Sequence, residues 1–453
     1  MSPSKDALIV IGGGLAGCEA AWQAASYGVD VELFEMRPHR ISPAHRTDTL
    51  AELVCSNSMR GAALENAVGL LKEELARCGS VIVESARANA VPAGGALAVD
   101  RDRFSAEVQA RIASHPRITV RREEVREVPL DRRAIVACGP LPGADLAGAI
   151  DRLVGAGRLH YYDAAAPIVA ADSIDETKMY RKSRYDKGGG DDYLNIPLDR
   201  DTYLRFVEDL RTLPRHEPKE FELEREGKVP YFEGCLPIEE MADRGDDVLR
   251  YGPLKPVGLQ DPRTGKIPYA VVQLRKENAS GTALNLVGFQ TRLSWPSQKE
   301  TFAKLPGLEE AEWLRLGVMH RNTFIDSPRL LDAQLRLRAH PNVWFAGQVT
   351  GAEGYVEAAA CGMIAGRSAA REMLGLEPIA VPAETAHGAI VAHLQNAATA
   401  DFQPANVTWT YFTVGGDLPR GKRERRKVMA ERALVRIAAW QSAHGATSLV
   451  SVG

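Results

Sequence analysis

The sequence lacks the long apolar runs that membrane proteins need. No stretch of its 453 residues approaches about eighteen consecutive apolar side chains, so we expect no membrane span. The N-terminal apolar run is short and shows no signal-peptide anatomy, which favours a cytoplasmic protein. Hydrophobic residues make up 45% of the chain and charged residues 25%, as in ordinary globular proteins. The length is enough for roughly two or three domains.

Paired cysteines and a strong net charge are also missing. The six cysteines lie at positions 18, 55, 78, 138, 235 and 361. No two of them form a C-x-x-C pair, which argues against a disulfide framework and against a metal site. The net charge of −3 gives no global attraction for nucleic acid, so any contact with a polyanion must come from a local patch.

The most informative stretch lies near the N-terminus. The run Ala7–Ile11 predicts a buried strand, residues 18–27 predict an Ala-rich helix, and residues 29–35 predict a second strand. The turn after the first strand has the spacing G-x-G-x-x-G, and an acid ends the second strand. In a β-turn-α-β unit this combination predicts a dinucleotide-binding site. The expected cofactor contacts are Gly12, Gly13, Gly14, Leu15, Ala16, Gly17 and Glu35.

Each of these residues has a physical reason to be there. Gly12 permits the tight turn, Gly14 lets the backbone approach a pyrophosphate, and Gly17 allows the helix to pack closely on the strand. The helix N-terminus offers unpaired N–H groups to the phosphates. Glu35 is placed to accept a hydrogen bond from a ribose hydroxyl. The alternative is a glycine-rich turn without a ligand.

A second glycine-rich turn occurs late in the chain. Residues 342–347 predict a strand, and a small-residue helix is predicted over 358–374. The sequence has no second complete fingerprint, because Gly188–Gly190 follows a charged loop rather than an apolar strand. One permanently held FAD fits this pattern better than NAD, and NADH or NADPH would then visit transiently. The expected contacts in the turn are Gly347, Gln348, Gly351, Glu353, Gly354 and Tyr355. Tyr355 is either a stacking residue or an aromatic at a helix start.

The pattern predicts an α/β fold with a split Rossmann-like FAD-binding domain. Its first part is expected over 1–170 and its second over 326–380, with an α+β insertion domain at 171–325 on the substrate side. Within the insertion, residues 177–192 are charged and predict a mobile surface loop. Residues 381–453 form a C-terminal segment with a basic helix.

That basic helix has eight Lys or Arg and three acids between Asp417 and Arg436. Met429, Ala433, Ile437 and Trp440 give it one apolar face. Its basic face is either an ordinary solvated surface or a contact with a nucleic-acid backbone.

Two of the six cysteines differ from the rest. Cys55 and Cys235 lie in polar turns just before predicted helices, whereas the other four lie in apolar runs or close a helix. A helix N-terminus lowers the pKa of a thiol and favours the nucleophilic thiolate. The alternative for both is a small residue buried at a turn.

Several segments together resemble the FAD- and folate-dependent tRNA (uracil-5-)-methyltransferases, the TrmFO family. The resemblance covers essentially the whole chain and is most specific around the two cysteines. The matching segments are Ile11–Gly17, Ala51–Arg60, Glu233–Glu239, Tyr251–Gly258, Val287–Leu293, His320–Phe324 and Gly347–Glu357. The resemblance implies a fold of the glutathione-reductase/GidA type with FAD as cofactor.

The resemblance also implies a reaction. Methylenetetrahydrofolate donates a one-carbon unit to C5 of uridine 54 in the T-loop of tRNA, and FAD reduced by NADH or NADPH supplies the electrons. Thiolate addition at C6 makes C5 of uracil nucleophilic, and a base then removes the C5 proton. We expect Cys235 to attack C6 and Cys55, close to the flavin, to handle the proton or the methylene, although the two roles can be exchanged. No obligate protein partner is inferred.

Other residues of the matching segments are candidates for contacting folate or the target nucleotide. These candidates are Asn57, Arg292, His320, Arg321 and Asn322. The alternative for His320 and Arg321 is a hydrogen-bonded structural pair. Three other functions stay open: GidA/MnmG-like modification of a tRNA wobble uridine, a small-molecule NAD(P)H flavin oxidoreductase, and a catalytically silent flavin-dependent RNA-binding protein.

Overall fold

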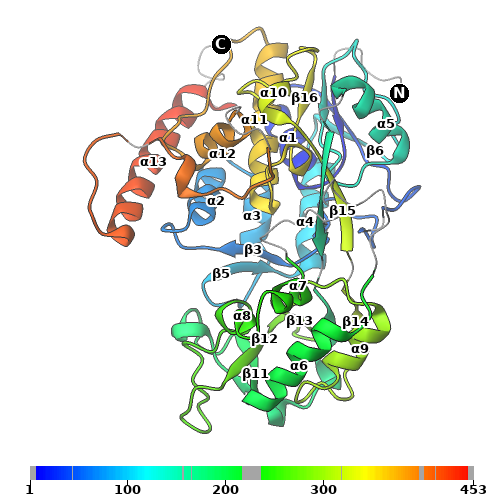
Figure 1. Cartoon of the computed structure of the whole chain (residues 1–453). Coiled ribbons are helices and arrows are strands. Elements are labelled where there is room, and N and C mark those ends of the chain that lie inside the picture. Colours follow the sequence, from blue (N-terminus) through cyan, green and yellow to red (C-terminus); the bar gives the residue numbers. More distant parts are fainter. Residues whose placement is uncertain are drawn as a thin grey trace.

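A five-stranded parallel sheet lies at the centre of the larger part of the molecule (Figure 1). The computed structural model describes residues 7–42, 44–155, 158–164, 166–216, 236–317, 319–396, 402–413 and 415–446, with the backbone only for 158–164 and 319–321. In sheet order the strands are β16 (Val343–Phe345), β7 (Ala134–Val136), β1 (Leu8–Ile11), β2 (Val31–Phe34) and β6 (Ile118–Arg121). Every residue of β1 is buried, as expected for a central parallel strand covered on both faces.

Two long helices pack against each other on this sheet. They are α1 (Leu15–Ser26) and α11 (Tyr355–Met373). Gly362 is needed at the crossing, because a Cβ there would lie 2.2 Å from the carbonyl oxygen of Ala16. The predicted strand–turn–helix units at both ends of the domain are therefore confirmed, although α11 begins three residues earlier than the predicted 358–374. The other helices of this part are α2 (Ala67–Arg77), α3 (Val81–Ala88), α4 (Arg101–Ser114), α5 (Ala144–Val154), α10 (Ser327–Leu330), α12 (Ala386–Leu394) and α13 (Lys422–His444).

A second unit is built on an antiparallel sheet of six strands, drawn in green in the lower half of Figure 1. In sheet order these are β10 (Tyr180–Arg181), β11 (Tyr193–Leu198), β12 (Ala270–Lys276), β13 (Ala283–Leu286), β9 (Ile168–Ala170) and β14 (Trp313–Arg315). Its helices are α6 (Arg200–Thr212), α7 (Ile238–Asp243), α8 (Val248–Tyr251) and α9 (Trp295–Phe302). This mixture is the α+β insertion that the sequence predicts.

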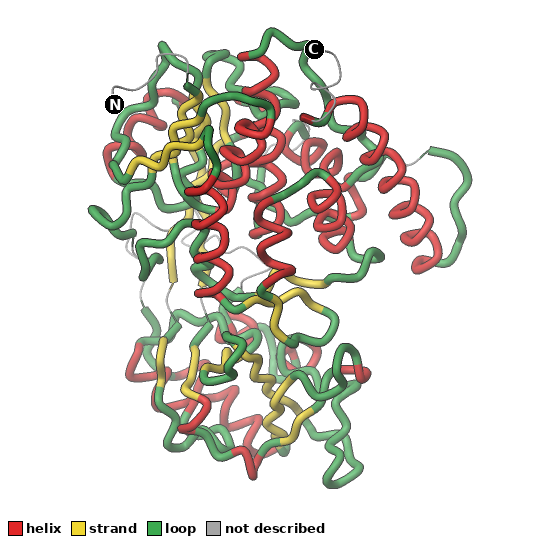
Figure 2. Tube along the Cα trace, turned by 180° about the vertical axis from the view of Figure 1, so that it is seen from behind, coloured by secondary structure: helices red, strands yellow, loops and turns green. Residues whose placement is uncertain are grey.

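Each unit has its own hydrophobic core. The core of the smaller unit lies between Ala166 and Trp313, and the larger core joins the N-terminal elements to the elements after β15. Two smaller sheets lie between the units: the antiparallel pair β8 (Arg158–Ala164) and β15 (Met319–Ile325), and the sheet of β3 (Ser58–Gly61), β5 (Ala96–Val99) and β4 (Ala90–Val91). Figure 2 shows the same two-part arrangement from behind, with α13 at the side of the larger part. The division at residues 170, 325 and 380 stays a prediction.

The prediction that Cys55 lies just before a helix is wrong, and the predicted surface loop at 177–192 contains more regular structure than expected. The residue after Cys55–Asn57 enters strand β3, and the next helix starts only at Ala67, with Asn66 as its N-cap. Cys55 therefore does not directly precede a helix, because residues 58–61 pair with β5 instead. The predicted loop at 177–192 contains strand β10 and short 3₁₀ turns, and Asp192 accepts a hydrogen bond from the backbone N–H of Gly94 at 2.6 Å.

Candidate functional site

A cavity lies at the carboxyl ends of the parallel strands. Its volume is about 340 Å³, which is within the usual range for ligand pockets. The loops after β1, β2, β7 and β16 form one wall, and the Cys55 segment, Gln290 and Asn322 close it from the other side. In open α/β sheets this edge is the usual place for a ligand. The predicted cofactor contacts on the wall are Gly12, Gly13, Gly14, Leu15, Ala16, Glu35, Gly347, Gln348, Glu353, Gly354 and Tyr355.

The first glycine turn has the shape that a bound pyrophosphate requires. A Cβ on Gly12 would lie 2.4 Å from the carbonyl oxygen of Ala137, and a Cβ on Gly17 would lie 1.8 Å from that of Gly12. A Cβ on Gly14 would meet no atom within 4 Å, so this position is open space. No side chain caps the N-terminus of α1, which leaves its N–H groups for phosphates. The residues present therefore fit a dinucleotide such as FAD.

Glu35 is held in the cavity wall by its neighbours. Its carboxylate accepts hydrogen bonds from the backbone N–H of Gly13 at 2.9 Å and from Nε of Arg37 at 2.8 Å. Burial raises the pKa of Glu35, but the hydrogen bonds and charge of Arg37 outweigh it and the pKa is lowered. Glu35 is thus ionised at neutral pH, as an acceptor for ribose hydroxyls must be.

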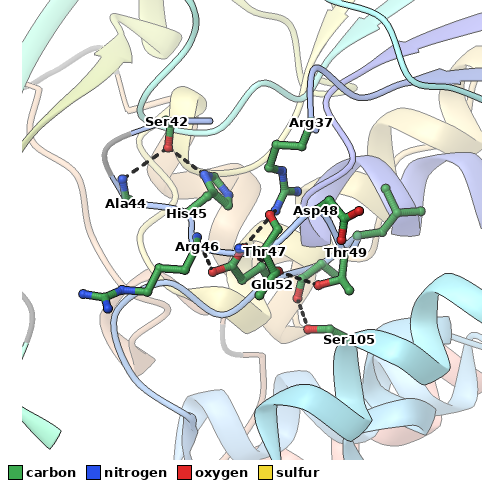
Figure 3. A network of polar contacts seen from close by, with 12 residues as sticks. Arg37, Ser42, Ala44, His45, Arg46, Thr47, Asp48, Thr49, Glu52 and Ser105 are labelled. Carbon is green, nitrogen blue, oxygen red and sulfur yellow. Dashed lines mark hydrogen bonds and ion pairs between the residues drawn. The ribbon is translucent and has the colours of Figure 1, made fainter. Parts of the chain in front are cut away.

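Arg37 belongs to a wider polar network that shapes the loop after β2 (Figure 3). It is only 1% exposed and also pairs with Glu52 at 3.0 Å. Glu52 in turn accepts the backbone N–H groups of Arg46 and Thr47 at 2.9 and 3.1 Å. Sequence reasoning missed Arg37, since a single arginine in a polar loop gives no periodic signal.

The segment with Cys55 is centred on the hydroxyl of Tyr355, the first residue of α11. This oxygen accepts the backbone N–H of Cys55 at 2.9 Å and that of Ser56 at 3.1 Å. It also lies 3.0 Å from Sγ of Cys55. A phenolic oxygen has two acceptor sites and one hydrogen to donate. Because the two N–H groups occupy both acceptor sites, the hydroxyl hydrogen points to Sγ.

The carbonyl groups of the same segment point the other way, toward two arginines. Arg101 of α4 binds the carbonyl oxygen of Leu53 and lies 3.5 Å from that of Cys55. Arg315 of β14 donates to the carbonyl oxygen of Val54 at 2.6 Å. Arg101 also pairs with Glu277 of the insertion at 2.5 Å. Both units thus hold the Cys55 segment in place, with two positive charges close to the thiol.

Burial keeps Tyr355 in its hydroxyl form. Burial, together with the adjacent Cys55, raises the pKa of Tyr355 well above its ordinary value. The two N–H donors would stabilise an anion on this oxygen, but they do not outweigh burial. At neutral pH Tyr355 is therefore a donor to Sγ.

The predicted substrate contacts are distributed unevenly. Asn322 lines the cavity. Asn57 is fully buried behind the Cys55 segment, where its amide donates to the carbonyl oxygens of Val99 and Lys276, so it holds the segment in place. Arg292 lies outside the cavity wall and pairs with Glu240 at 2.6 Å. A contact of Asn57 or Arg292 with substrate stays a prediction.

Three predicted residues cannot be placed at the level of side chains. Cys235 lies outside the described residues, and the side chains of His320 and Arg321 also lie outside them, although both residues belong to strand β15. Gly351 turns away from the cavity, since a Cβ there would lie 2.6 Å from the ring of Phe402.

The described part of the chain offers neither a metal-binding cluster nor a membrane-spanning helix. There, no group of three or more His, Cys, Asp or Glu side chains could hold a metal ion. None of the helices described is long and apolar enough to cross a membrane.

The basic face predicted for the C-terminal helix belongs to α13. Within the described chain, five of its basic residues form no ion pair: Lys422, Arg425, Arg426, Lys427 and Arg432. Arg423 is 90% exposed and lies 3.7 Å from Glu65. The apolar face, with Met429, Ala433, Ile437 and Trp440, is buried as predicted.

Comparison with known proteins gives the family. A family model described as GIDA, Glucose inhibited division protein A, matches residues 7–377. A relative from Heliobacterium modesticaldum, named methylenetetrahydrofolate–tRNA-(uracil-5-)-methyltransferase TrmFO, is 57% identical over 94% of this chain and 95% of its own length. One of the same name from Symbiobacterium thermophilum is 56% identical over 96% of this chain and 97% of its own. The chain belongs to the TrmFO family.

Among solved structures, Aquifex aeolicus GidA in its form I crystal is similar in fold. It has a TM-score of 0.71 and 17% identity, over 97% of this chain and 76% of that one. At this identity the likeness shows the fold alone. It confirms the predicted GidA-like FAD-binding fold with an insertion.

Proposed function

We propose that this protein transfers the one-carbon unit of methylenetetrahydrofolate to C5 of a uracil in tRNA, at uridine 54 of the T-loop. The names of the relatives support the reaction class. The observation that carries the proposal is the position of Cys55, which lies in the wall of the dinucleotide cavity with its thiol against Tyr355. All the reactants occur in the cytoplasm, where we expect the protein to act.

The cavity residues would hold FAD through its phosphates and ribose. The open turn at Gly14 and the uncapped start of α1 suit the pyrophosphate, and the ionised Glu35 suits a ribose. When bound, FAD supplies the electrons that NADH or NADPH delivers and can carry the one-carbon unit. No second dinucleotide fingerprint exists in the sequence, so the nicotinamide would bind transiently.

Two thiols divide the work on the uracil ring. The thiolate of Cys235 adds to C6, and the electron pair displaced toward C5 forms the bond to the methylene carbon. Cys55, as a thiolate, takes the C5 proton and becomes a thiol. Loss of this proton expels the nitrogen that carried the methylene carbon and leaves an exocyclic methylene group on the ring. A hydride, which reduced FAD would supply, then adds to this methylene carbon and expels the Cys235 thiolate, so the product is a 5-methyluracil. The hydroxyl of Tyr355 donates to Sγ of Cys55 and stabilises the thiolate before proton transfer.

The basic face of α13 would hold phosphates of the tRNA. Five of its cations have no ion-pair partner among the described residues, so little binding energy is lost in separating these five from acids. Phosphate contacts orient an RNA without reading its sequence. The uracil of a folded T-loop must be everted to reach the cavity, which is the usual solution for enzymes that modify a base.

Transfer of isotope from folate to tRNA tests the proposal. Purified protein with FAD, NADPH and methylene-labelled methylenetetrahydrofolate should label an unmodified tRNA transcript. A transcript in which uridine 54 is replaced by cytidine is the matched control and should stay unlabelled. Label on a wobble uridine would instead favour the GidA/MnmG-like reaction, and no label on any transcript would contradict the proposal.

A further inference from the structure

Residues 402–407, near the C-terminus, form hydrogen bonds with the second glycine turn. The backbone N–H of Ala405 donates to the carbonyl oxygen of Gly351 at 3.1 Å, and that of Glu353 donates to the carbonyl oxygen of Ala405 at 3.0 Å. The N–H of Val407 donates to the Glu357 carboxylate at 2.9 Å. Residues 402–407 lie beyond the region matched by the GIDA family model, which ends at 377. This segment therefore adds a wall that the shared region does not contain.

Asn406 is the residue of this wall whose side chain lines the cavity. Its Nδ2 donates to the carbonyl oxygen of Glu353 at 2.7 Å, which fixes the orientation of the amide. An asparagine amide has two donor hydrogens and one acceptor oxygen. Within the described chain, one of these hydrogens and Oδ1 have no partner.

Arg60 of β3 forms the second side of the same corner. A Cβ on Gly354 would lie 2.5 Å from Oε2 of Glu357, 3.0 Å from a guanidinium nitrogen of Arg60 and 3.3 Å from Nδ2 of Asn406, so all three groups surround one point. Only one guanidinium nitrogen has a described partner, the carboxylate of Glu357. Glu357 is fully buried and thus fixes the arginine.

The backbone of Arg60 is strained in this position. Its φ is +62°, in the left-handed region that non-glycine residues rarely adopt. The buried Lys72 holds the strand on both sides, since its Nζ donates to the carbonyl oxygens of Met59 at 2.8 Å and Gly61 at 2.9 Å. Strained residues held in this way cluster at ligand sites.

We propose that Arg60 and Asn406 form a subsite for the cyclic amide edge of a heterocycle, that is, a ring N–H next to a ring C=O. Oδ1 of Asn406 accepts from the ring N–H, and its remaining hydrogen donates to the ring C=O. Arg60 donates to a further oxygen of the ligand. A simple anion would be repelled by Oδ1, and an apolar group would leave all these groups unpaired.

The identity of the ring rests on the proposed function, which brings three such edges to the cavity: the pyrimidine ring of the flavin, the pterin of the folate and the target uracil. All three place N–H beside C=O, so they share the chemistry that the corner recognises. Measuring the three ligands separately distinguishes them.

Two variants and a matched control test the subsite. Asn406→Asp keeps the size but removes the donors, and Asn406→Ser removes the amide, in case the aspartate variant does not fold. Gln403→Glu makes the same amide-to-acid change at an exposed position of the same segment, outside the cavity wall. The readouts are FAD affinity of the apoprotein, KM for methylenetetrahydrofolate, and affinity for an RNA hairpin with the target uracil.

We expect one of the three ligands to bind about ten- to hundred-fold more weakly to both Asn406 variants, and Gln403→Glu to match the wild type. N-methylation of the ring N–H of that ligand should weaken binding to the wild type but add little further loss in Asn406→Ser. A smaller effect of N-methylation in Asn406→Ser would show that Asn406 contacts the ring N–H directly. If Asn406 only supported the turn at Glu353, N-methylation would weaken binding equally in both proteins.

Unchanged binding of all three ligands would overturn the subsite, and so would an equal effect of N-methylation in wild type and variant. Failure of the proposed function has a different signature. If the wild type transfers no label to tRNA but FAD affinity depends on Asn406 and on the ring N–H, the methylation proposal fails while the subsite stands.

Discussion

The hydroxyl of Tyr355 lies 3.0 Å from Sγ of Cys55, and the backbone N–H groups of residues 55 and 56 point to the same oxygen. These residues are 300 positions apart in the chain. They meet because the segment after β2 returns to the start of α11 at the carboxyl edge of the parallel sheet. In this contact the Tyr355 hydroxyl gives the Cys55 thiol a hydrogen-bond donor from a residue that is distant in the sequence.

Replacing Tyr355 with Phe removes that donor and leaves two backbone N–H groups unpaired. We expect kcat/KM for tRNA methylation to fall about ten- to hundred-fold, as for the loss of one hydrogen bond to a charged group. Alkylation of Cys55 by iodoacetamide at neutral pH should slow as well, measured in a Cys235→Ala background. Tyr251→Phe, at a tyrosine that is 80% exposed, is the control. Equal alkylation rates in the two variants would contradict the proposed role of the hydroxyl.

Lys72 predicts a pH dependence of stability. Burial lowers its pKa from 10.5 to about 7 in the folded protein. Between these values the unfolded chain binds more protons than the folded one, so the free energy of unfolding rises with pH. Relative to Lys72→Met, which cannot titrate, the wild type should gain about 2 kcal/mol between pH 7 and pH 9 in urea unfolding experiments. Parallel pH profiles for the two proteins would show that Lys72 stays charged when folded.

Arg101 predicts a large effect on folding. It pairs with Glu277, which is 5% exposed, and it also holds carbonyl oxygens of the Cys55 segment. Arg101→Met leaves a buried carboxylate without its cation, which costs about 3–5 kcal/mol. Exposed Arg103, two positions along on the same helix, provides the control as Arg103→Met. A thermal unfolding midpoint for Arg101→Met equal to that of the control would mean that the pair contributes nothing.

The basic face of α13 should make tRNA binding depend on the salt concentration. The triple variant Lys422→Ala, Arg425→Ala, Lys427→Ala should weaken tRNA binding for all sequences alike. The slope of log K against log salt concentration should decrease by roughly 2 to 3, since each lost phosphate contact contributes about 0.7–0.9. Three exposed arginines on other helices, Arg103, Arg152 and Arg205, changed together to Ala, are the control. An unchanged slope in the α13 variant would contradict a role in holding phosphates.

Local patterns predicted the parts of the site that one short segment contains. The strand–turn–helix at Gly12–Gly17 and the late turn at Gly347–Gly354 both lie in the cavity wall as expected, because their shape depends on glycine spacing alone. The fold class followed from these two units and from the mixed elements between them.

Contacts between distant segments were not predictable in the same way. The helix expected after Cys55 is present as α2, but strand β3 precedes it, because residues 58–61 pair with β5 instead of continuing the capping signal of the serines into a helix. Arg101, Arg315 and Asn406 gave no sequence signal, since each is a single polar residue whose role depends on where the chain folds back. Tyr355 and Cys55 were both identified as candidate site residues, but the contact between them was not predicted.

The most direct test of the account is to locate the transferred carbon in the product. Unmodified tRNA is incubated with the FAD-loaded protein, NADPH and carbon-13 methylenetetrahydrofolate, then cleaved and analysed by mass spectrometry. We predict a carbon-13 methyl group on uridine 54 with the wild type and none with Cys55→Ala or Cys235→Ala. A tRNA without the labelled methyl group after incubation with wild-type protein, or label at another position, would contradict the central claim.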